Sequence, residues 1–220
     1  ELGKDLRMRN GKLRLPFTGN RIDLLPAVPK PGTVASADVL IDGKKPSEFP
    51  ELYAIARPSA TQLGFWPGIK RVSHQKPLAL ETWRARITEV NDAADQFKFS
   101  VTGSVTGADG AGTSGQRFVS NSGRVVIEPE DWHLKSAREF GKKNVPEGFE
   151  VTWTVIPQFV DVYQAPKEVD ATRDNAVTLA QGLPNGPHTL ELSTPDGKPL
   201  AIRAIRVYEP PFKLAPVPGK

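Results

Sequence analysis

The chain has 220 residues, among them 21 prolines, 19 glycines and no cysteine, and a formal net charge of +4. So many helix breakers exclude a fold of long helices, and a 38% hydrophobic share excludes a disordered chain. The absence of cysteine excludes disulfides and cysteine-ligated metals. Lysines and arginines are spread among acidic residues, so nucleic acid binding is not indicated. No apolar run approaches the roughly 20 residues that a membrane-spanning helix needs. These features predict an all-β protein.

The first sixty residues combine short strands with turns. Residues 13–17 and 21–25 alternate between apolar and polar side chains, and the residues between them predict a bend that separates two short strands. A third strand is predicted at residues 37–41, where it runs into the Asp42-Gly43 turn.

The middle of the chain begins with a segment rich in proline and aromatic residues, 45–80. Two interpretations stay open for it. It is either a functional loop or an irregular segment whose aromatic side chains pack onto a β-sandwich formed by the rest of the chain. Beyond it, residues 82–90 and 96–102 alternate with period two and predict an antiparallel pair. A further strand is predicted at residues 149–156.

Two other middle segments are predicted to lack strands. Residues 103–115 are mostly glycine, serine, threonine and alanine, which favours a flexible loop; its Asp109 is an alternative calcium ligand. Residues 129–140 predict the one short helix, since acidic side chains stand near its start and Gly141 follows it.

The last strand signals lie between Gly182 and Tyr208. Two apolar runs, residues 189–192 and 200–207, flank the turn sequence Pro195-Asp196-Gly197, and together they predict a β-hairpin. A lone hairpin is unstable in water, so it must complete a sheet formed by earlier strands.

The two ends of the chain carry motifs of a known family. The sequences of residues 17–21 and 39–43, with those of residues 182–192 and 205–208, resemble the galactose-binding-like jelly-roll modules that precede SGNH (GDSL-type) hydrolase domains in secreted bacterial carbohydrate esterases. The resemblance implies a jelly-roll β-sandwich formed by residues 1–58 and 167–212, a β-rich insertion at 59–166 and a proline-rich linker at 213–220.

The same resemblance implies a biological setting. It implies a secreted or periplasmic bacterial protein whose signal peptide lies upstream of this sequence, with a neighbouring hydrolase domain as partner. In this family pattern Asp42 and His188 serve first for hydrogen bonding at a turn and a strand edge, and only second for ligand contact.

Catalytic motifs are not evident in the sequence. An SGNH hydrolase needs a Gly-Asp-Ser nucleophile segment and a late Asp-X-X-His, and neither is present. Esterase activity of the chain itself remains an alternative, with Ser120, Ser122 and Ser136 near Asp131 and His133 in sequence. The histidines at 74, 133 and 188 are too scattered for a zinc motif. No cofactor is expected, and a structural calcium ion bridging a jelly-roll loop stays open.

Aromatic residues supply the remaining clue, because sugar rings stack on flat side chains while planar polar groups bind the hydroxyls. The predicted ligand-binding residues are Tyr53, Arg57, Trp66, Arg71, His74 and Trp132. The competing interpretation of Trp66 and Trp132 is a buried plug over the sandwich. We therefore expect a non-catalytic accessory module that binds carbohydrate. A purely structural or interaction domain and an esterase are the alternatives.

Overall fold

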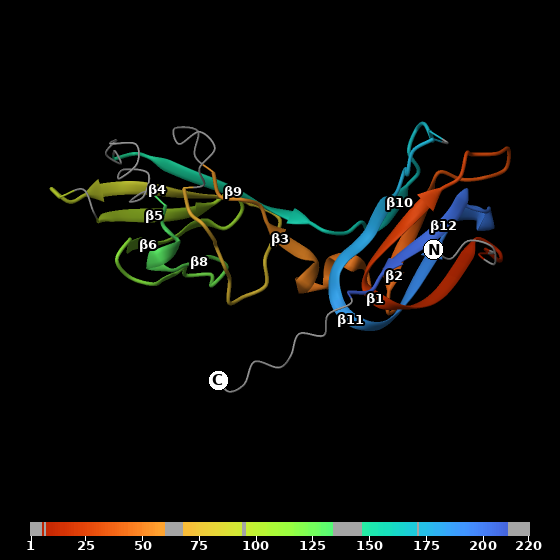
Figure 1. Cartoon of the computed structure of the whole chain (residues 1–220), viewed down its shortest axis with the longest axis horizontal. Helices are drawn as coiled ribbons and strands as arrows, with labels where there is room; N and C mark the ends of the chain where they lie inside the picture. Colours follow the sequence, from red (N-terminus) through yellow and green to blue (C-terminus); the bar gives the residue numbers. More distant parts are fainter. Residues whose placement is uncertain are drawn as a thin grey trace. The chain divides into compact units, whose positions relative to one another are not determined.

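The computed structural model describes residues 6, 8–59, 68–93, 96–133, 147–170 and 172–210. It confirms the all-β prediction, because 53% of the chain is strand, 7% is helix, and no helix in the described part reaches 7 residues. The chain divides into two compact units, unit 1 with Glu1–Leu52 and Pro157–Lys220, and unit 2 with Tyr53–Ile156. The expected boundaries lay at 58/59 and 166/167. Figure 1 follows both units along the chain.

Unit 1 is built on one five-stranded sheet of antiparallel neighbours in the order β10-β2-β11-β1-β12. Its strands are β1 (Lys12–Pro26), β2 (Ser36–Ile41), β10 (Val162–Gln164), β11 (Val177–Ser193) and β12 (Ile202–Tyr208). The prediction of two short strands within residues 13–25 was wrong, because β1 runs through the expected bend. β10 falls within the range that the sequence assigned to the insertion, yet it extends this sheet beside β2.

The predicted hairpin at residues 189–207 was also wrong. The turn itself forms as a short 3₁₀ segment, η5 (Pro195–Gly197), and Asp196 and Gly197 have φ values of 59° and 65°. However, β11 and β12 do not pair with each other, because β1 lies between them and pairs with both. The turn residues specify where the chain reverses. The neighbour of each of the two strands is instead determined by β1, some 180 residues earlier, because β1 pairs with both of them.

A large bulge interrupts the pairing of β1 with β11. Gly19 pairs with Gly186 and Arg21 pairs with Gln181, so residues 182–185 of β11 stand opposite Asn20 alone. We call residues 182–185 the β11 bulge. Such an irregularity bends both strands, and the core of unit 1 contains side chains from both sides of it. These are chiefly Leu13, Phe17, Ile22, Leu24, Val39, Ile41, Tyr163, Leu179, Leu183, Leu190, Leu192 and Ile205.

Unit 2 has a second five-stranded sheet, in the order β3-β9-β4-β5-β6. Its strands are β3 (Tyr53–Ile55), β4 (Thr82–Val90), β5 (Phe97–Gly103), β6 (Gly107–Thr113) and β9 (Glu150–Pro157); β7 (Phe118–Val119) and β8 (Val126–Ile127) form a separate pair. The predicted antiparallel pair is confirmed as β4 and β5. The strand predicted at 149–156 is β9, and it pairs with β4.

Part of the predicted flexible loop at residues 103–115 is instead the strand β6. Its glycines suit close packing, since a Cβ on Gly112 would lie 2.7 Å from Cδ2 of Phe118. Asp109 on this strand is buried, and its carboxylate accepts hydrogen bonds from the amide and the hydroxyl of Ser122. Glycine lowers the strand propensity of this segment, but it also lets β6 approach the aromatic core.

The described helical segments are single 3₁₀ turns, η1 (Pro46–Glu48), η2 (Pro50–Leu52), η4 (Pro129–Asp131) and η5. The predicted short helix at 129–140 is represented by η4, and residues 134–140 lie outside the described residues. None of the helices in the described ranges has the length and apolar character needed to cross a membrane.

Candidate functional site

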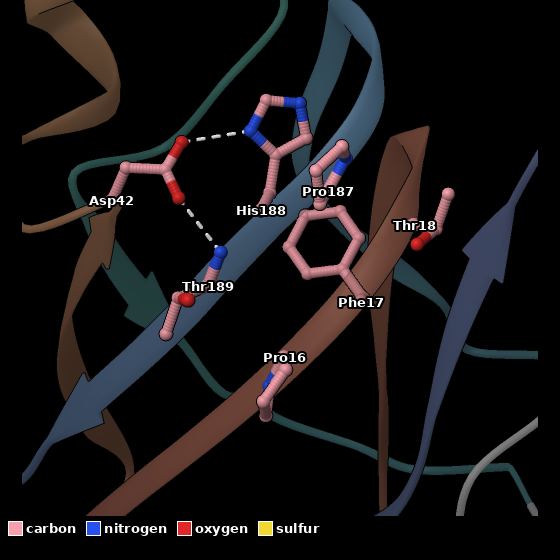
Figure 2. A pocket seen from close by; sticks show the side chains of 7 residues that line it. All are labelled: Pro16, Phe17, Thr18, Asp42, Pro187, His188 and Thr189. Atoms are coloured by element: carbon pink, nitrogen blue, oxygen red, sulfur yellow. Dashed lines mark hydrogen bonds and ion pairs between the residues drawn. The ribbon is translucent and has the colours of Figure 1, made fainter.

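Three successive cross-strand pairs of β1 and β11 form an open depression on unit 1. The pairs are Pro16 with Thr189, Phe17 with His188, and Thr18 with Pro187. Together with Asp42, these residues line a depression of about 470 Å³. Figure 2 shows Asp42 facing the β11 residues, with the ring of Phe17 beside His188. The centroids of those two rings are 5.5 Å apart.

Asp42 is directed toward β11 by the turn that ends β2. Asp42 and Gly43 have φ values of 51° and 78°, as tight hairpin turns require, and Ile41 and Lys44 exchange backbone hydrogen bonds across the turn. The Asp42 amide donates to the carbonyl of Thr189 at 2.9 Å, and the Thr189 amide donates to Oδ1 of Asp42 at 2.7 Å. The carboxylate is therefore fixed beside β11, just past the end of β2.

Both ring nitrogens of His188 contact oxygen acceptors. Nδ1 lies 2.7 Å from Oδ2 of Asp42, and Nε2 lies 2.8 Å from the carbonyl oxygen of Pro184. Neither a carboxylate nor a carbonyl can donate, so the two contacts are both hydrogen bonds only when the ring is a doubly protonated imidazolium. The expectation that Asp42 and His188 serve for hydrogen bonding is confirmed, with Asp42 in a turn and His188 on β11, which is an interior strand of its sheet.

The pKa of His188 reflects two opposing effects. Burial of the ring, whose side chain is 10% exposed, lowers the pKa. The hydrogen bond with Asp42, the hydrogen bond with the Pro184 carbonyl and the charges of Asp42 and Glu51 raise it, and the net result is a pKa above the ordinary value of 6.5. When its ring is protonated, His188 balances the charge of the neighbouring carboxylate.

The contacts of this Asp-His pair differ from those of a catalytic Asp-His pair. A histidine that activates a nucleophile needs a free lone pair on the nitrogen opposite its aspartate. In His188 that nitrogen is engaged by Pro184. The lining of the depression includes hydroxyls only from Thr18 and Thr189. The carboxylate of Asp42, 40% exposed, remains open to a ligand that donates hydrogen bonds.

Trp132 does not have the exposure that a sugar-stacking residue needs, which corrects its predicted role. Its side chain is in the core of unit 2 and the residue is only 6% exposed. The ring packs edge-on against Phe97 with centroids 4.9 Å apart, and against Phe99 at 4.8 Å. The plug interpretation therefore describes this tryptophan.

The other predicted ligand residues are distributed over unit 2. Tyr53 is half-buried in β3 and packs against the core of unit 2, and Arg57 is exposed just after that strand. Arg71 lies 3.6 Å from Asp131 and so stands beside the Trp132 segment. His74 is exposed, with Nδ1 3.0 Å from the Lys76 carbonyl. Trp66 lies outside the described residues.

The serines considered for an esterase take part in turn structure. The Ser122 hydroxyl donates to Oδ2 of Asp109 at 2.7 Å, and the Ser120 hydroxyl accepts from the Val125 amide at 3.2 Å. Asp131 pairs with Arg71, and Ser136 lies outside the described residues. Within the described ranges, no group of three or more histidine, aspartate or glutamate side chains is placed so that it could hold a metal ion.

Sequence reasoning missed the lining of the depression. The prolines and threonines at 16, 18, 187 and 189 carry no motif of their own, and only their pairing across β1 and β11 brings them together. The available signal was the Asp42 turn and His188, which the sequence had marked for hydrogen bonding. Comparison of the chain with protein-family models, with curated proteins and with solved structures found no match.

Proposed function

We propose that this chain is a non-catalytic carbohydrate-binding module and that the depression beside Asp42 is its sugar site. One observation carries the proposal: a carboxylate that is 40% exposed is held in place by the Thr189 amide and His188, at the edge of a depression lined by apolar and hydroxyl-bearing side chains. A carboxylate oriented in advance binds sugar hydroxyls without the cost of ordering its side chain.

The lining suits the two-sided chemistry of a sugar ring. Sugars present C–H groups to apolar surfaces and hydroxyls to planar polar groups. Here Pro16 and Pro187 supply the apolar surface, and Phe17 also belongs to the lining, although it is only 7% exposed. Asp42 accepts hydrogen bonds from sugar hydroxyls, and Thr18 can both donate and accept.

The charge of the site favours uncharged sugars. Asp42 brings one negative charge, and the ring of His188 behind it adds one positive charge when it is protonated. A sugar acid would place its carboxylate beside Asp42, where the two like charges repel each other. We therefore infer a neutral oligosaccharide or polysaccharide as the ligand class.

The setting of the module rests on the sequence resemblance alone. We propose that it is an accessory module of a larger secreted or periplasmic bacterial enzyme with an SGNH-type hydrolase domain. The coding sequence that surrounds this chain tests the proposal, because an SGNH domain should follow Lys220 in the same reading frame. A reading frame without a hydrolase domain would contradict it.

Binding is tested by a glycan array of plant and bacterial polysaccharides, followed by titration calorimetry with the best neutral polysaccharide. Thr18→Val removes one hydroxyl from the depression and should weaken binding roughly three- to ten-fold, the loss of one hydrogen bond. Thr102→Val, at an exposed position of β5 in unit 2, is the matched control and should leave the affinity unchanged.

Two results would overturn the proposal. Failure of the wild-type chain to bind any polysaccharide would leave a structural or interaction role as the better description. Turnover of p-nitrophenyl acetate by the isolated chain, abolished by His133→Ala, would make the chain an esterase and contradict its non-catalytic assignment.

A further inference from the structure

His188 lies where three segments of unit 1 meet. Its Nδ1 contacts Asp42 in the turn after β2, its Nε2 contacts Pro184 in the β11 bulge, and its ring packs beside Phe17 of β1. The residues between Pro184 and His188 must curve, because an extended strand would separate residues four apart by about 13 Å, too far for a side chain to reach back. The imidazole therefore closes a loop in its own strand.

Besides the contact with His188, the β11 bulge makes further contacts through Leu183 and Gly182. Leu183 is buried in the core of unit 1 and anchors the bulge from below, whereas Pro184 and Asn185 are exposed. Gly182 passes close to η2, where a Cβ would lie 3.0 Å from the Glu51 carbonyl oxygen. The bulge thus has an apolar anchor at Leu183 and a polar one at His188.

The polar anchor is complete only in one protonation state. A neutral imidazole carries one N–H, so it can donate to Asp42 or to the Pro184 carbonyl, and its other nitrogen would then face an oxygen with no proton between them. Two opposed lone pairs repel each other, and one of the two contacts must open.

We propose that His188 is a proton-operated clasp, which in its charged form ties the β11 bulge to the Asp42 turn and on losing its proton releases the bulge beside the depression. The clasp is a property of unit 1 by itself. Only its consequence for ligands, weaker sugar binding at alkaline pH, rests on the proposed function.

The groups that face His188 determine whether the clasp is closed at low or at high pH. Asp42 comes from the turn after β2, Glu51 from η2, and β1 contributes the uncharged ring of Phe17. Burial lowers the pKa of His188, but the two hydrogen bonds and the two acidic charges outweigh it and raise the pKa above 6.5. Because the folded-state pKa is raised, the clasp is fully closed below the unfolded pKa and opens as the pH rises through the folded one.

The experiment is an NMR titration of the whole chain between about pH 5 and about pH 9, following the side-chain nitrogens of all three histidines. We expect the midpoint of His188 to lie above the ordinary value of 6.5. Both nitrogens of His188 should be protonated on the acidic side. Above the midpoint, the protection factors of the Leu183 and Asn185 amides, which correct for the faster intrinsic exchange at higher pH, should fall, while those of Thr82–Val90 in unit 2 should stay constant.

Variants separate the clasp from general effects of pH. Asp42→Asn should lower the His188 midpoint, His188→Gln should remove the pH response of the bulge amides, and His74→Gln should leave the His188 titration unchanged. A His188 midpoint at or below the ordinary value of 6.5, or bulge amides whose protection factors are the same on both sides of the midpoint, would overturn the clasp. If the NMR transition occurs but the chain binds no polysaccharide at any pH, the proposed function fails and the clasp stands.

Discussion

Glu81, just before β4, and Thr106, in the turn between β5 and β6, are joined by two hydrogen bonds. Oε1 of Glu81 accepts from the Thr106 hydroxyl at 2.8 Å, and Oε2 accepts from the Thr106 amide at 3.0 Å. Oε2 also accepts from the amide of Val105 at 3.2 Å. Glu81 is only 5% exposed, so this buried charge is compensated by donors that the turn supplies.

Replacement of Glu81 with Gln should destabilise unit 2 by about 2 to 3 kcal/mol, because the amide nitrogen cannot accept and would face donors of the turn. Urea unfolding followed by tryptophan fluorescence measures the change. Glu89→Gln is the matched control, since Glu89 pairs with Lys98 on the surface, where the two side chains are 57% and 58% exposed. That exposed pair should contribute no more than about 1 kcal/mol. Equal losses in the two variants would contradict the role of Glu81.

The paired glycines Gly19 and Gly186, next to the β11 bulge, should differ in their tolerance of a methyl group. A Cβ on Gly19 would lie 2.4 Å from the backbone carbonyl oxygen of Tyr208, whereas a Cβ on Gly186 would have nothing within 4 Å. Gly19→Ala should cost roughly 1 to 3 kcal/mol through overpacking against backbone. Gly186→Ala should be neutral or stabilise the chain by up to about 1 kcal/mol. Thermal unfolding of both variants compares them, and a loss at Gly186 that equals the loss at Gly19 would contradict the packing argument.

Local alternation was enough to predict the strands of unit 2 that have one buried face. In β4, Trp83, Ala85 and Ile87 are buried while their neighbours are exposed, as the period of two requires. The prediction failed where the pairing depended on distant segments. Pro195-Asp196-Gly197 correctly indicated a turn. However, no local pattern could show that β1 would lie between β11 and β12, the strands before and after this turn.

The candidate site was predictable in its individual residues and not in its assembly. Asp42 and His188 were recognised as hydrogen-bonding residues, yet they are 146 positions apart, and their mutual contact follows from the pairing of β2 with β11. Trp132 shows the converse case. Its loop-like sequence context left plug and platform open, and only the packing of Phe97 and Phe99 around it distinguishes them.

Truncation of Trp132 tests that distinction directly. Trp132→Ala should destabilise unit 2 by about 3 to 5 kcal/mol, since a large buried ring is removed from between two phenylalanines. Tyr208→Ala is the comparison, because Tyr208 is 37% exposed and its ring carries the guanidinium of Arg21 at 4.6 Å. Loss of that contact should cost only about 1 kcal/mol. Unchanged stability of Trp132→Ala in urea, combined with lost polysaccharide binding, would restore the platform interpretation.

Asp174 should make the stability of unit 1 sensitive to acid. Its carboxylate accepts hydrogen bonds from Arg206 and, at 2.9 Å, from Arg203 of the same strand. The hydrogen bond from Arg206 is the main cause that lowers the pKa of Asp174 below its usual value of 3.8. Because the folded-state pKa is lowered, the contribution of this carboxylate is present above the unfolded pKa and is lost as the pH falls through the folded one.

Asp174→Asn should therefore be less stable than the wild-type chain near neutral pH, and the difference should disappear as the pH falls through the folded-state pKa of Asp174. Urea midpoints measured across this range give the difference at each pH. Asp92→Asn, at an exposed turn of unit 2, is the control and should follow the wild-type profile. The contribution is salt-sensitive, since the ion pairs of Asp174 lie at the surface, and added salt should narrow the gap at neutral pH. A gap that persists unchanged in acid would show that Asp174 acts through packing and not through its charge.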